Sequence, residues 1–255
     1  MVRILVAGLL ALALPLGASA GAVVESLKGT ARVGQKALTQ GARFEAPTSI
    51  ATGAGSQVTP KFDDGMQIVL DENSLLRVLY FQHAEKKFPD GAVFELLAGA
   101  ARVVTGRVAA DHPRSFLFRA PQTQLTVERP ADFSVVLVNP AYIAVHSGSV
   151  TSFNGSGTAT LAQGSTTVVA TDAAAPAAIA PSAMPQSAVA AMQTLQTASV
   201  GPPAGASAAG APPTVDTAGT PGIPVSAVLV TLGIAAAALA AGGGGGDGVT
   251  ATTQH

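Results

Sequence analysis

Apolar and polar positions change character along the chain and divide it into unlike segments. Residues 4–16 form an apolar run, and residues 21–170 alternate short apolar runs with turn-forming Gly, Asp, Asn and Pro. Residues 171–222 consist mainly of Ala, Pro, Ser, Thr and Gly, and residues 223–241 form a second apolar run without a charge. The pattern therefore predicts a folded domain in the middle of the chain.

The middle region has the pattern of short β-strands. It shows no stretch with the 3.6-residue period of a helix, whereas residues 115–119 place two phenylalanines on one face of an extended chain. Residues 92–97 and 101–105 are interpreted as two further strands. Asp64 and Gly65 separate two apolar runs and predict a two-residue hairpin loop, because glycine tolerates the positive φ that such loops require.

These features predict an all-β fold for residues 21–170. We expect a single domain of short stacked antiparallel strands, arranged as a sandwich or as a solenoid-like roll. Every aromatic residue, 9 Phe and 2 Tyr, lies between Phe44 and Phe153. The large side chains that build a core are therefore confined to this region.

Composition narrows the possible functions. The chain of 255 residues contains 14 Lys and Arg, 15 Asp and Glu, and no Cys. The lack of Cys excludes a disulfide framework, a Cys-ligated zinc site and a thiol nucleophile. The net charge of −1 offers no excess of positive charge for binding phosphates, so we expect no nucleic-acid partner.

Residues 1–20 have the pattern of a secretory signal peptide. Arg3 precedes the apolar run 4–16, and Ala-Ser-Ala at residues 18–20 provides the small-x-small pattern for cleavage before Gly21. The alternative is an uncleaved membrane anchor, which the short apolar run fits less well. We therefore expect export to the bacterial periplasm or cell surface.

The last third of the chain is predicted to be a tether. Residues 171–222 are rich in proline and contain no aromatic residue, so we expect a disordered linker. Residues 223–241 are long enough for a transmembrane helix. Gly233, Ala237 and Ala241 recur on one face of that helix and suit helix–helix self-association. The alternative for this segment is an Ala-rich interfacial or assembly element.

Several short motifs follow one another in an order and spacing similar to those of the FecR domain family. Ile-Ala-Thr-Gly-Ala-Gly-Ser at residues 50–56 resembles the family's I-x-T-G-x-G-S stretch, and Asp64-Gly65 resembles its D-G hairpin. Further similar motifs lie at residues 73–75, 97–103, 116–121, 145–150 and 161–164. The motif positions to which we assign a structural role are Thr52, Gly53, Asp64, Gly65, Gly99, Pro121, Gly148 and Gly164.

The resemblance implies an envelope β-domain over about residues 40–168. Family members that contact a sigma factor carry a cytoplasmic segment before a transmembrane helix. Here an export signal comes first, so the resemblance does not imply anti-sigma activity. One motif departs from the family pattern, because Pro130 and Ala131 stand where the family has Gly and Thr after an Arg. Proline lacks an N–H and fixes φ at about −65°, so we assign this motif no role.

No residue pattern indicates catalysis or a cofactor. His83 with Glu85 and His112 with Asp111 are isolated pairs, typical of solvated turns rather than of metal sites. The glycine run that opens residues 242–255 lacks the Lys-Ser/Thr of a phosphate-binding loop, so we expect a flexible tail. The densest acidic cluster offers either a weak calcium site or solvated hairpin ends. Its members are Asp63, Asp64, Asp71 and Glu72.

Together these observations predict a non-enzymatic, exported protein of the cell envelope. We expect it to be tethered to a membrane through residues 223–241 and to act by protein interaction or by sensing an envelope signal, without a metal or cofactor. The alternative is a carbohydrate- or peptidoglycan-binding module at the cell surface. In that case Tyr80 and Tyr142 are the candidate platforms for sugar rings.

Overall fold

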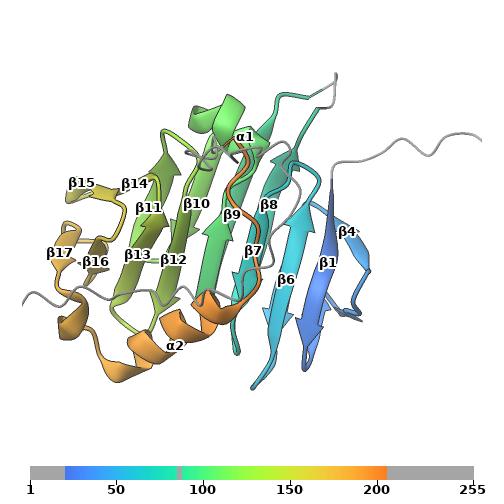
Figure 1. Cartoon of the computed structure of the whole chain (residues 1–255), viewed down its shortest axis with the longest axis horizontal. Helices are drawn as coiled ribbons and strands as arrows, with labels where there is room; N and C mark the ends of the chain where they lie inside the picture. The colour runs from blue at the N-terminus through green and yellow to red at the C-terminus, as the bar shows by residue number, and fades with distance from the viewer. Residues whose placement is uncertain (1–20, 85–87, 206–255) are drawn as a thin grey trace, which may run out of the picture. The chain divides into compact units, whose positions relative to one another are not determined.

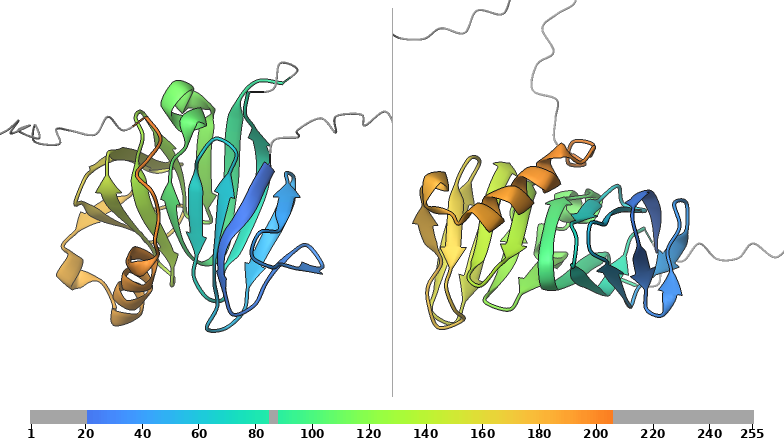
Figure 2. Two further views of the ribbon diagram at one scale, coloured as in Figure 1. Left: turned by 45° about the vertical axis from the view of Figure 1, so that its right-hand side comes forward. Right: turned by 90° about the horizontal axis from the view of Figure 1, so that it is seen from below.

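Strands from Gly21 onward build two sheets that pack face to face (Figures 1 and 2). The computed structural model describes residues 21–84 and 88–205. The predicted signal peptide, transmembrane helix and tail lie outside the described residues, as does the last part of the predicted linker.

One strand, β9 (Gly91–Val104), belongs to both sheets. In spatial order the first sheet consists of β4 (Arg43–Glu45), β1 (Gly21–Lys28), β6 (Gln57–Phe62), β7 (Gln67–Leu70), β9, β12 (Asp132–Leu137), β13 (Ala141–Ser147), β16 (Thr166–Val169) and β17 (Ala177–Ile179). The second sheet consists of β3 (Lys36–Ala37), β2 (Ala31–Val33), β5 (Thr48–Thr52), β8 (Leu75–Gln82), β9, β10 (Phe116–Ala120), β11 (Thr123–Val127), β14 (Ser149–Asn154) and β15 (Gly157–Ala162). Neighbouring strands are antiparallel except β9 and β10, which are parallel.

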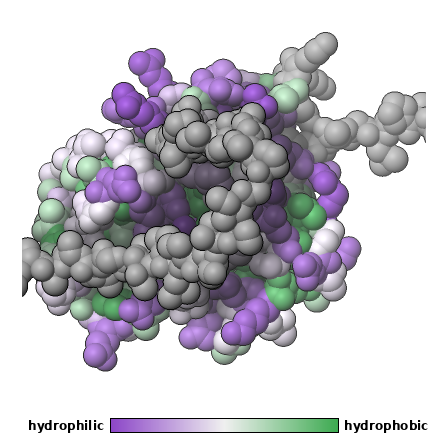
Figure 3. Space-filling view, viewed as in Figure 1, coloured by the Kyte–Doolittle hydropathy of each residue, from purple (hydrophilic) through white to green (hydrophobic). Residues whose placement is uncertain are grey.

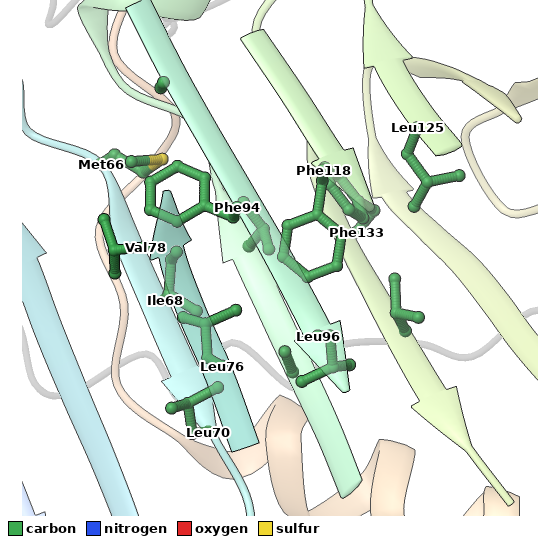
Figure 4. Close-up of a cluster of buried hydrophobic side chains, with 14 of the residues drawn as sticks. Met66, Ile68, Leu70, Leu76, Val78, Phe94, Leu96, Phe118, Leu125 and Phe133 are labelled. Carbon is green, nitrogen blue, oxygen red and sulfur yellow. The ribbon is translucent and has the colours of Figure 1, made fainter. Parts of the chain in front are cut away.

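The main core lies between the two sheets, where alternate residues of each strand meet. Phe116 and Phe118 of β10 are both buried, which confirms the face predicted from the alternation. The ring of Phe118 packs edge-on against that of Phe133, with 5.9 Å between centroids. Figure 4 shows these rings among aliphatic side chains from both sheets. The all-β fold of stacked antiparallel strands is thereby confirmed.

Strand β9 is one bent strand and not the two strands predicted at 92–97 and 101–105. Its first half pairs with β8 in the second sheet, and its second half pairs with β7 and β12 in the first sheet. The change of sheet occurs at Gly99, whose φ is +78°. Only glycine adopts this conformation without strain, so the glycine that looked like a break in the strand is the bend itself.

The β6–β7 hairpin has a three-residue loop and not the predicted two-residue loop. The N–H of Phe62 donates to the carbonyl of Met66 at 2.8 Å, and the N–H of Gly65 donates to the carbonyl of Phe62 at 2.9 Å. Gly65 has a φ of +88°. This is a type I turn followed by a left-handed residue, the usual three-residue hairpin loop. Asp63 is the additional loop residue.

Two short helices connect the parallel strands β9 and β10. They are α1 (Arg107–Asp111) and the 3-10 helix η1 (Pro113–Ser115). Parallel neighbours cannot be joined by a tight turn and need a crossover connection. This requirement explains why helical structure interrupts the strands at this point.

The segment after β16 first adds β17 to the edge of the first sheet and then returns over the outer face of that sheet. The returning part forms the 3-10 helix η2 (Pro181–Ala183) and α2 (Gln186–Thr197), and α2 lies across the sheet in Figure 2. Ala188, Met192 and Leu195 of α2 are buried. They pack against an apolar stripe of the first sheet that consists of Val69, Ala100, Val136, Tyr142 and Ala144.

The prediction of a disordered linker over residues 171–222 is therefore wrong for residues 171–205, and the domain extends beyond residue 170. The sequence of residues 187–198 suggests at most a weak, transient helix, whereas α2 covers nearly the same residues as a packed helix. The composition of this segment is too poor in large side chains for folding alone. However, three apolar side chains with helical spacing suffice when a sheet supplies the other half of the contact. Within residues 21–84 and 88–205, no helix has the length and apolar character needed to cross a membrane.

Candidate functional site

Most of the motif glycines lie where the chain passes from one sheet to the other. Gly53 lies between β5 and β6, Gly148 between β13 and β14, and Gly164 between β15 and β16. Gly99 makes the same passage within β9. The two remaining motif turns join neighbouring strands of one sheet: Asp64 and Gly65 lie between β6 and β7, and Pro121 lies in the exposed connection between β10 and β11.

The motif residue Thr52 is linked to Gly99 through Ser74. The Thr52 hydroxyl accepts the N–H of Ser74 at 2.8 Å and donates to the carbonyl of Asp71 at 2.6 Å. The Ser74 hydroxyl accepts the N–H of Ala100 at 2.9 Å and donates to its carbonyl at 3.0 Å. The two bonds of the Ser74 hydroxyl satisfy backbone groups of Ala100 at the bend of β9, and those of Thr52 satisfy backbone groups in the connection between β7 and β8.

Asp64 joins the β6–β7 hairpin to α1. Its carboxylate accepts the N–H of Met66 at 2.9 Å and the N–H of Val108 at 3.2 Å. The side chain is almost completely buried. Burial raises the pKa of the Asp64 carboxyl, and the two N–H donors oppose that rise. Gly106 is adjacent, and a Cβ at this position would overlap the Asp64 carboxylate.

The family motif with Pro130 and Ala131 in place of Gly and Thr forms the entry to β12. Both the N–H and the carbonyl of Ala131 bond to the Thr105 hydroxyl, at 2.8 and 3.1 Å. The carbonyl of Pro130 lies so close to Gly148 that a Cβ there would overlap it. These motif residues are therefore engaged with backbone atoms. Thr52 and Gly53 also line a cavity of about 380 Å³, which the other motif positions do not share. We propose on this basis that all of the motif positions are structural.

Polar side chains gather instead on the outer face of the first sheet, next to α2. The Arg102 guanidinium forms two bonds with the Asp132 carboxylate, at 2.9 and 2.6 Å, and both side chains are about nine-tenths buried, with exposed fractions of 13% and 10%. Arg102 also donates to the carbonyls of Leu195 and Gln196 at the end of α2, each at 3.4 Å. Where this face is visible in the space-filling view, hydrophilic side chains lie among apolar ones (Figure 3).

Arg102 thus connects the sheet to the helix. A positive group at the last carbonyls of a helix is favourable because these carbonyls have no partner within the helix. Gln57 and Gln67 add two contacts to the same segment, with the Thr194 carbonyl at 3.5 Å and the Gly201 N–H at 2.7 Å. The end of α2 and the residues after it, from Thr194 to Gly201, are therefore held to the sheet by polar contacts.

Ser134 and His146 form a second polar pair beneath α2. Ser134 Oγ lies 2.8 Å from His146 Nε2, and the serine is completely buried. Burial lowers the pKa of His146; the nearby Asp132 carboxylate opposes this effect, and the Arg102 guanidinium adds to it. A serine next to a histidine and an aspartate has the composition of a catalytic triad. Here Asp132 is bound to Arg102 and Ser134 is closed to solvent, so the group stabilises the face and offers no nucleophile to a substrate.

The sequence pattern did not reveal this face. Arg102 and Asp132 are separated by 30 positions and meet only because β9 and β12 are neighbours in the sheet. One feature of the sequence could have indicated the buried Arg102–Asp132 pair. Arg102 occupies the same strand face as Ala100, two residues earlier, in an otherwise apolar segment. A charged residue in such a run predicts a buried partner elsewhere in the fold.

In the structure, His83 and His112 share one acidic neighbour, Asp90. His83 Nδ1 lies 3.4 Å from Asp90 Oδ2, and His112 Nε2 lies 4.0 Å from the same atom. Asp90 is thus the shared neighbour, and Glu85 lies outside the described residues. No group of three or more His, Cys, Asp or Glu within the described ranges is arranged to hold a metal ion.

The acidic cluster and the tyrosines are likewise separated by the fold. Asp63 pairs with Arg43 at 3.0 Å beside the hairpin loop, whereas Glu72 accepts the N–H of Gly55 beyond the other end of β7. Tyr142 lies beneath α2 with 7% of its surface exposed, so it cannot present its ring to a sugar. The Tyr80 hydroxyl donates to the carbonyl of Pro89 at 2.7 Å.

The fold and these contacts define an all-β domain whose polar groups bond chiefly to its own backbone. The model of the FecR protein family matches residues 48–151, from β5 into β14. This match confirms the resemblance seen in the motifs: the chain contains a FecR region.

Two crystal structures of a proposed anti-sigma factor from Parabacteroides distasonis ATCC 8503, at 2.50 and 1.65 Å resolution, are similar to the chain at 18% sequence identity. Their TM-scores are 0.40 and 0.39, and each match covers 47% of this chain and 53% of the other. The chain therefore spans about half the length of these structures. A search of the curated proteins found no match.

Proposed function

We propose that this chain is a non-enzymatic protein of the bacterial cell envelope that acts by protein interaction or by sensing an envelope signal. The observation that carries the proposal is the FecR match over residues 48–151. Proteins of this family are typically associated with the envelope. Residues 1–20 support export by their signal-peptide pattern, and residues 223–241 support a membrane tether by their length and lack of charge.

The arrangement of polar groups supports a role without catalysis. The one serine–histidine pair beneath α2 is buried, and its neighbouring aspartate is bound by Arg102. Binding through an exposed surface requires no such reactive group, whereas catalysis requires one that reaches the substrate. The carbohydrate-binding alternative loses one of its two candidate platforms, because Tyr142 is covered by α2.

A reporter fusion tests the export step. Alkaline phosphatase, which is active only outside the cytoplasm, is joined after residue 205 and the fusion is expressed in bacterial cells. We expect activity from the fusion that begins at Met1 and at most background activity from a matched fusion that lacks residues 2–20. Equal activities, or background activity from both, would contradict an envelope location.

Carbonate extraction of membranes tests the tether in the same cells. The full chain is expected in the extracted membrane pellet, and a chain that lacks residues 223–241 is expected in the soluble fraction. A chain that partitions identically with and without this segment would exclude it as the anchor. Such a result would leave the export step standing, because that step is read out by the phosphatase.

A further inference from the structure

The four edges of the two sheets differ in length. The edge strands β4 and β17 have 3 residues each and β3 has 2 residues, whereas β15 has 6 residues. Short edges expose few free backbone groups and are a common protection against pairing with another chain. Charged residues and proline give the same protection, and the β15 sequence Gly-Thr-Ala-Thr-Leu-Ala contains neither.

The outer side of β15 is open within the part of the chain that the structure describes. There, β15 pairs only with β14. The following segment passes the β14–β15 turn, where the Asn154 side chain donates to the carbonyl of Ala174 at 2.7 Å, but it does not continue along the strand. Leu161 is buried in the core and fixes the strand in place, while Thr158 and Thr160 are exposed.

The hairpin register indicates which residues of β15 direct their backbone groups outward. The turn at Gly155 and Ser156 closes on the Asn154–Gly157 pair. In a two-residue hairpin the closing pair is hydrogen-bonded, and bonded pairs then alternate along the ladder. The residues whose N–H and carbonyl groups both point outward and are free are accordingly Thr158 and Thr160. Ala162 also points outward, but its carbonyl already accepts the N–H and the hydroxyl of Ser165, at 3.0 and 2.5 Å, so only its N–H is available.

We propose that β15 pairs antiparallel with β15 of a second copy of this chain, about a two-fold axis at Thr160. This register aligns Thr160 with Thr160, and it aligns Thr158 with Ala162 so that the free N–H of Ala162 donates to the carbonyl of Thr158. An axis one residue away, at Ala159, would end the ladder at Thr160 and leave the Ala162 N–H unpaired. The pairing opposes no like charges and places two threonines side by side, a favourable cross-strand pair.

A second copy fits this edge better than a foreign peptide does. Domains that capture peptides by strand addition select them through pockets for alternate side chains. The principal cavities of the described residues are lined by other segments, such as the one of about 380 Å³ beside Arg32 and Gly53. None of these five cavities is lined by a residue of β15. Recognition at this edge then depends on backbone and register, and an identical strand supplies both. Because the pairing is a single ladder, we expect a weak, concentration-dependent dimer.

Disulfide trapping tests the register, because the chain has no native Cys. Thr160→Cys is introduced into the full-length protein, which is purified in detergent, oxidised and analysed on a non-reducing gel. Directly opposed Cα atoms in a bonded antiparallel pair are about 5.5 Å apart, within the range of a disulfide. We expect Thr160→Cys to form a covalent dimer at least ten times faster than Thr126→Cys. Thr126 lies on the interior strand β11 of the same sheet and is the matched control.

The pairing of Thr158 with Ala162 provides an independent readout of the same axis. Thr158→Cys alone is expected to cross-link slowly, and a mixture of Thr158→Cys with Ala162→Cys is expected to cross-link rapidly. Equal rates for Thr160→Cys and Thr126→Cys would overturn the dimer. Rapid self-cross-linking of Thr158→Cys would overturn the register.

Sedimentation of variants without an added thiol excludes trapping of random collisions. The mass-average molecular weight of the wild-type protein is expected to rise with concentration, whereas that of Thr160→Lys rises less because like charges would face each other across the axis. Thr126→Lys is the control for the added charge. A wild-type protein that remains monomeric at every concentration, or a Thr160→Lys variant that associates like the wild type, would contradict the proposal.

Discussion

Replacing Arg102 by alanine is expected to lower the free energy of unfolding by about 3–5 kcal/mol, because the change leaves the buried Asp132 carboxylate without its partner. The same change removes the donor to the carbonyls of Leu195 and Gln196 at the end of α2. Urea unfolding of residues 21–205, followed by far-UV circular dichroism, measures the loss.

Arg77→Ala is the matched control for this variant. Arg77 pairs with Glu95 between two strands at 3.1 Å, but its side chain is 52% exposed. Such exposed pairs contribute at most about 1 kcal/mol. The double change Arg102→Met with Asp132→Leu is expected to lose less stability than Arg102→Ala, because it removes both charges. Equal losses for Arg102→Ala and Arg77→Ala would show that the buried pair does not hold this face.

Gly99→Ala is expected to lower the free energy of unfolding by about 3 kcal/mol, which is the second of the two largest effects that we predict. The φ of +78° is unfavourable for any residue with a Cβ, by about 1–2 kcal/mol. In addition, the new Cβ would overlap Ser74 Oγ and lie 2.5 Å from Ser74 Cα. Backbone atoms cannot move aside without breaking the bonds from Ser74 to Ala100, so overpacking adds a further 1–3 kcal/mol or so.

Gly164→Ala separates the two causes. Gly164 has nearly the same φ, +80°, but no atom lies within 4 Å of a Cβ built at this position. It is expected to lose only the conformational part, about 1–2 kcal/mol. Thermal unfolding of both variants in the 21–205 protein measures the difference. If the two variants unfold at the same temperature, the contact between Ser74 and the bend of β9 carries no stability of its own.

The alternation of apolar residues predicted the sheet content, the aromatic core and most strand positions. It was reliable where one face of a strand is buried, as at Phe116 and Phe118. It failed for the shortest strands, such as β3, whose two residues are both exposed and carry no alternation. It also divided β9 at Gly99, because a glycine that bends a strand and a glycine that ends one look identical in sequence.

The motifs located turns more accurately than they located function. Asp64 and Gly65 mark a hairpin, and Thr52 and Gly99 meet at one bend of the chain. The contacts beneath α2 could not be predicted in the same way. Arg102, Asp132 and Leu195 come from three distant segments, and only the strand order of the first sheet brings them together.

The error over residues 171–205 has a physical cause. Composition measures whether a segment can build a core of its own, and this segment cannot. A 12-residue helix such as α2 is also marginal in isolation. Both arguments consider the segment alone and leave out the sheet, whose outer face offers an apolar stripe for the helix to cover. The stripe includes Val136 and Tyr142, which would face water without α2.

The central structural claim is that α2 is a permanent part of the domain that contains the FecR region, so that the outer face of the first sheet is closed. Hydrogen exchange of the full-length protein tests this claim most directly. We predict that the amides of residues 190–197 exchange slowly, at rates closer to those of β12 than to those of the exposed turn at Gly155. Exchange of these amides at the rate of an unstructured peptide, within the shortest labelling time, would contradict it.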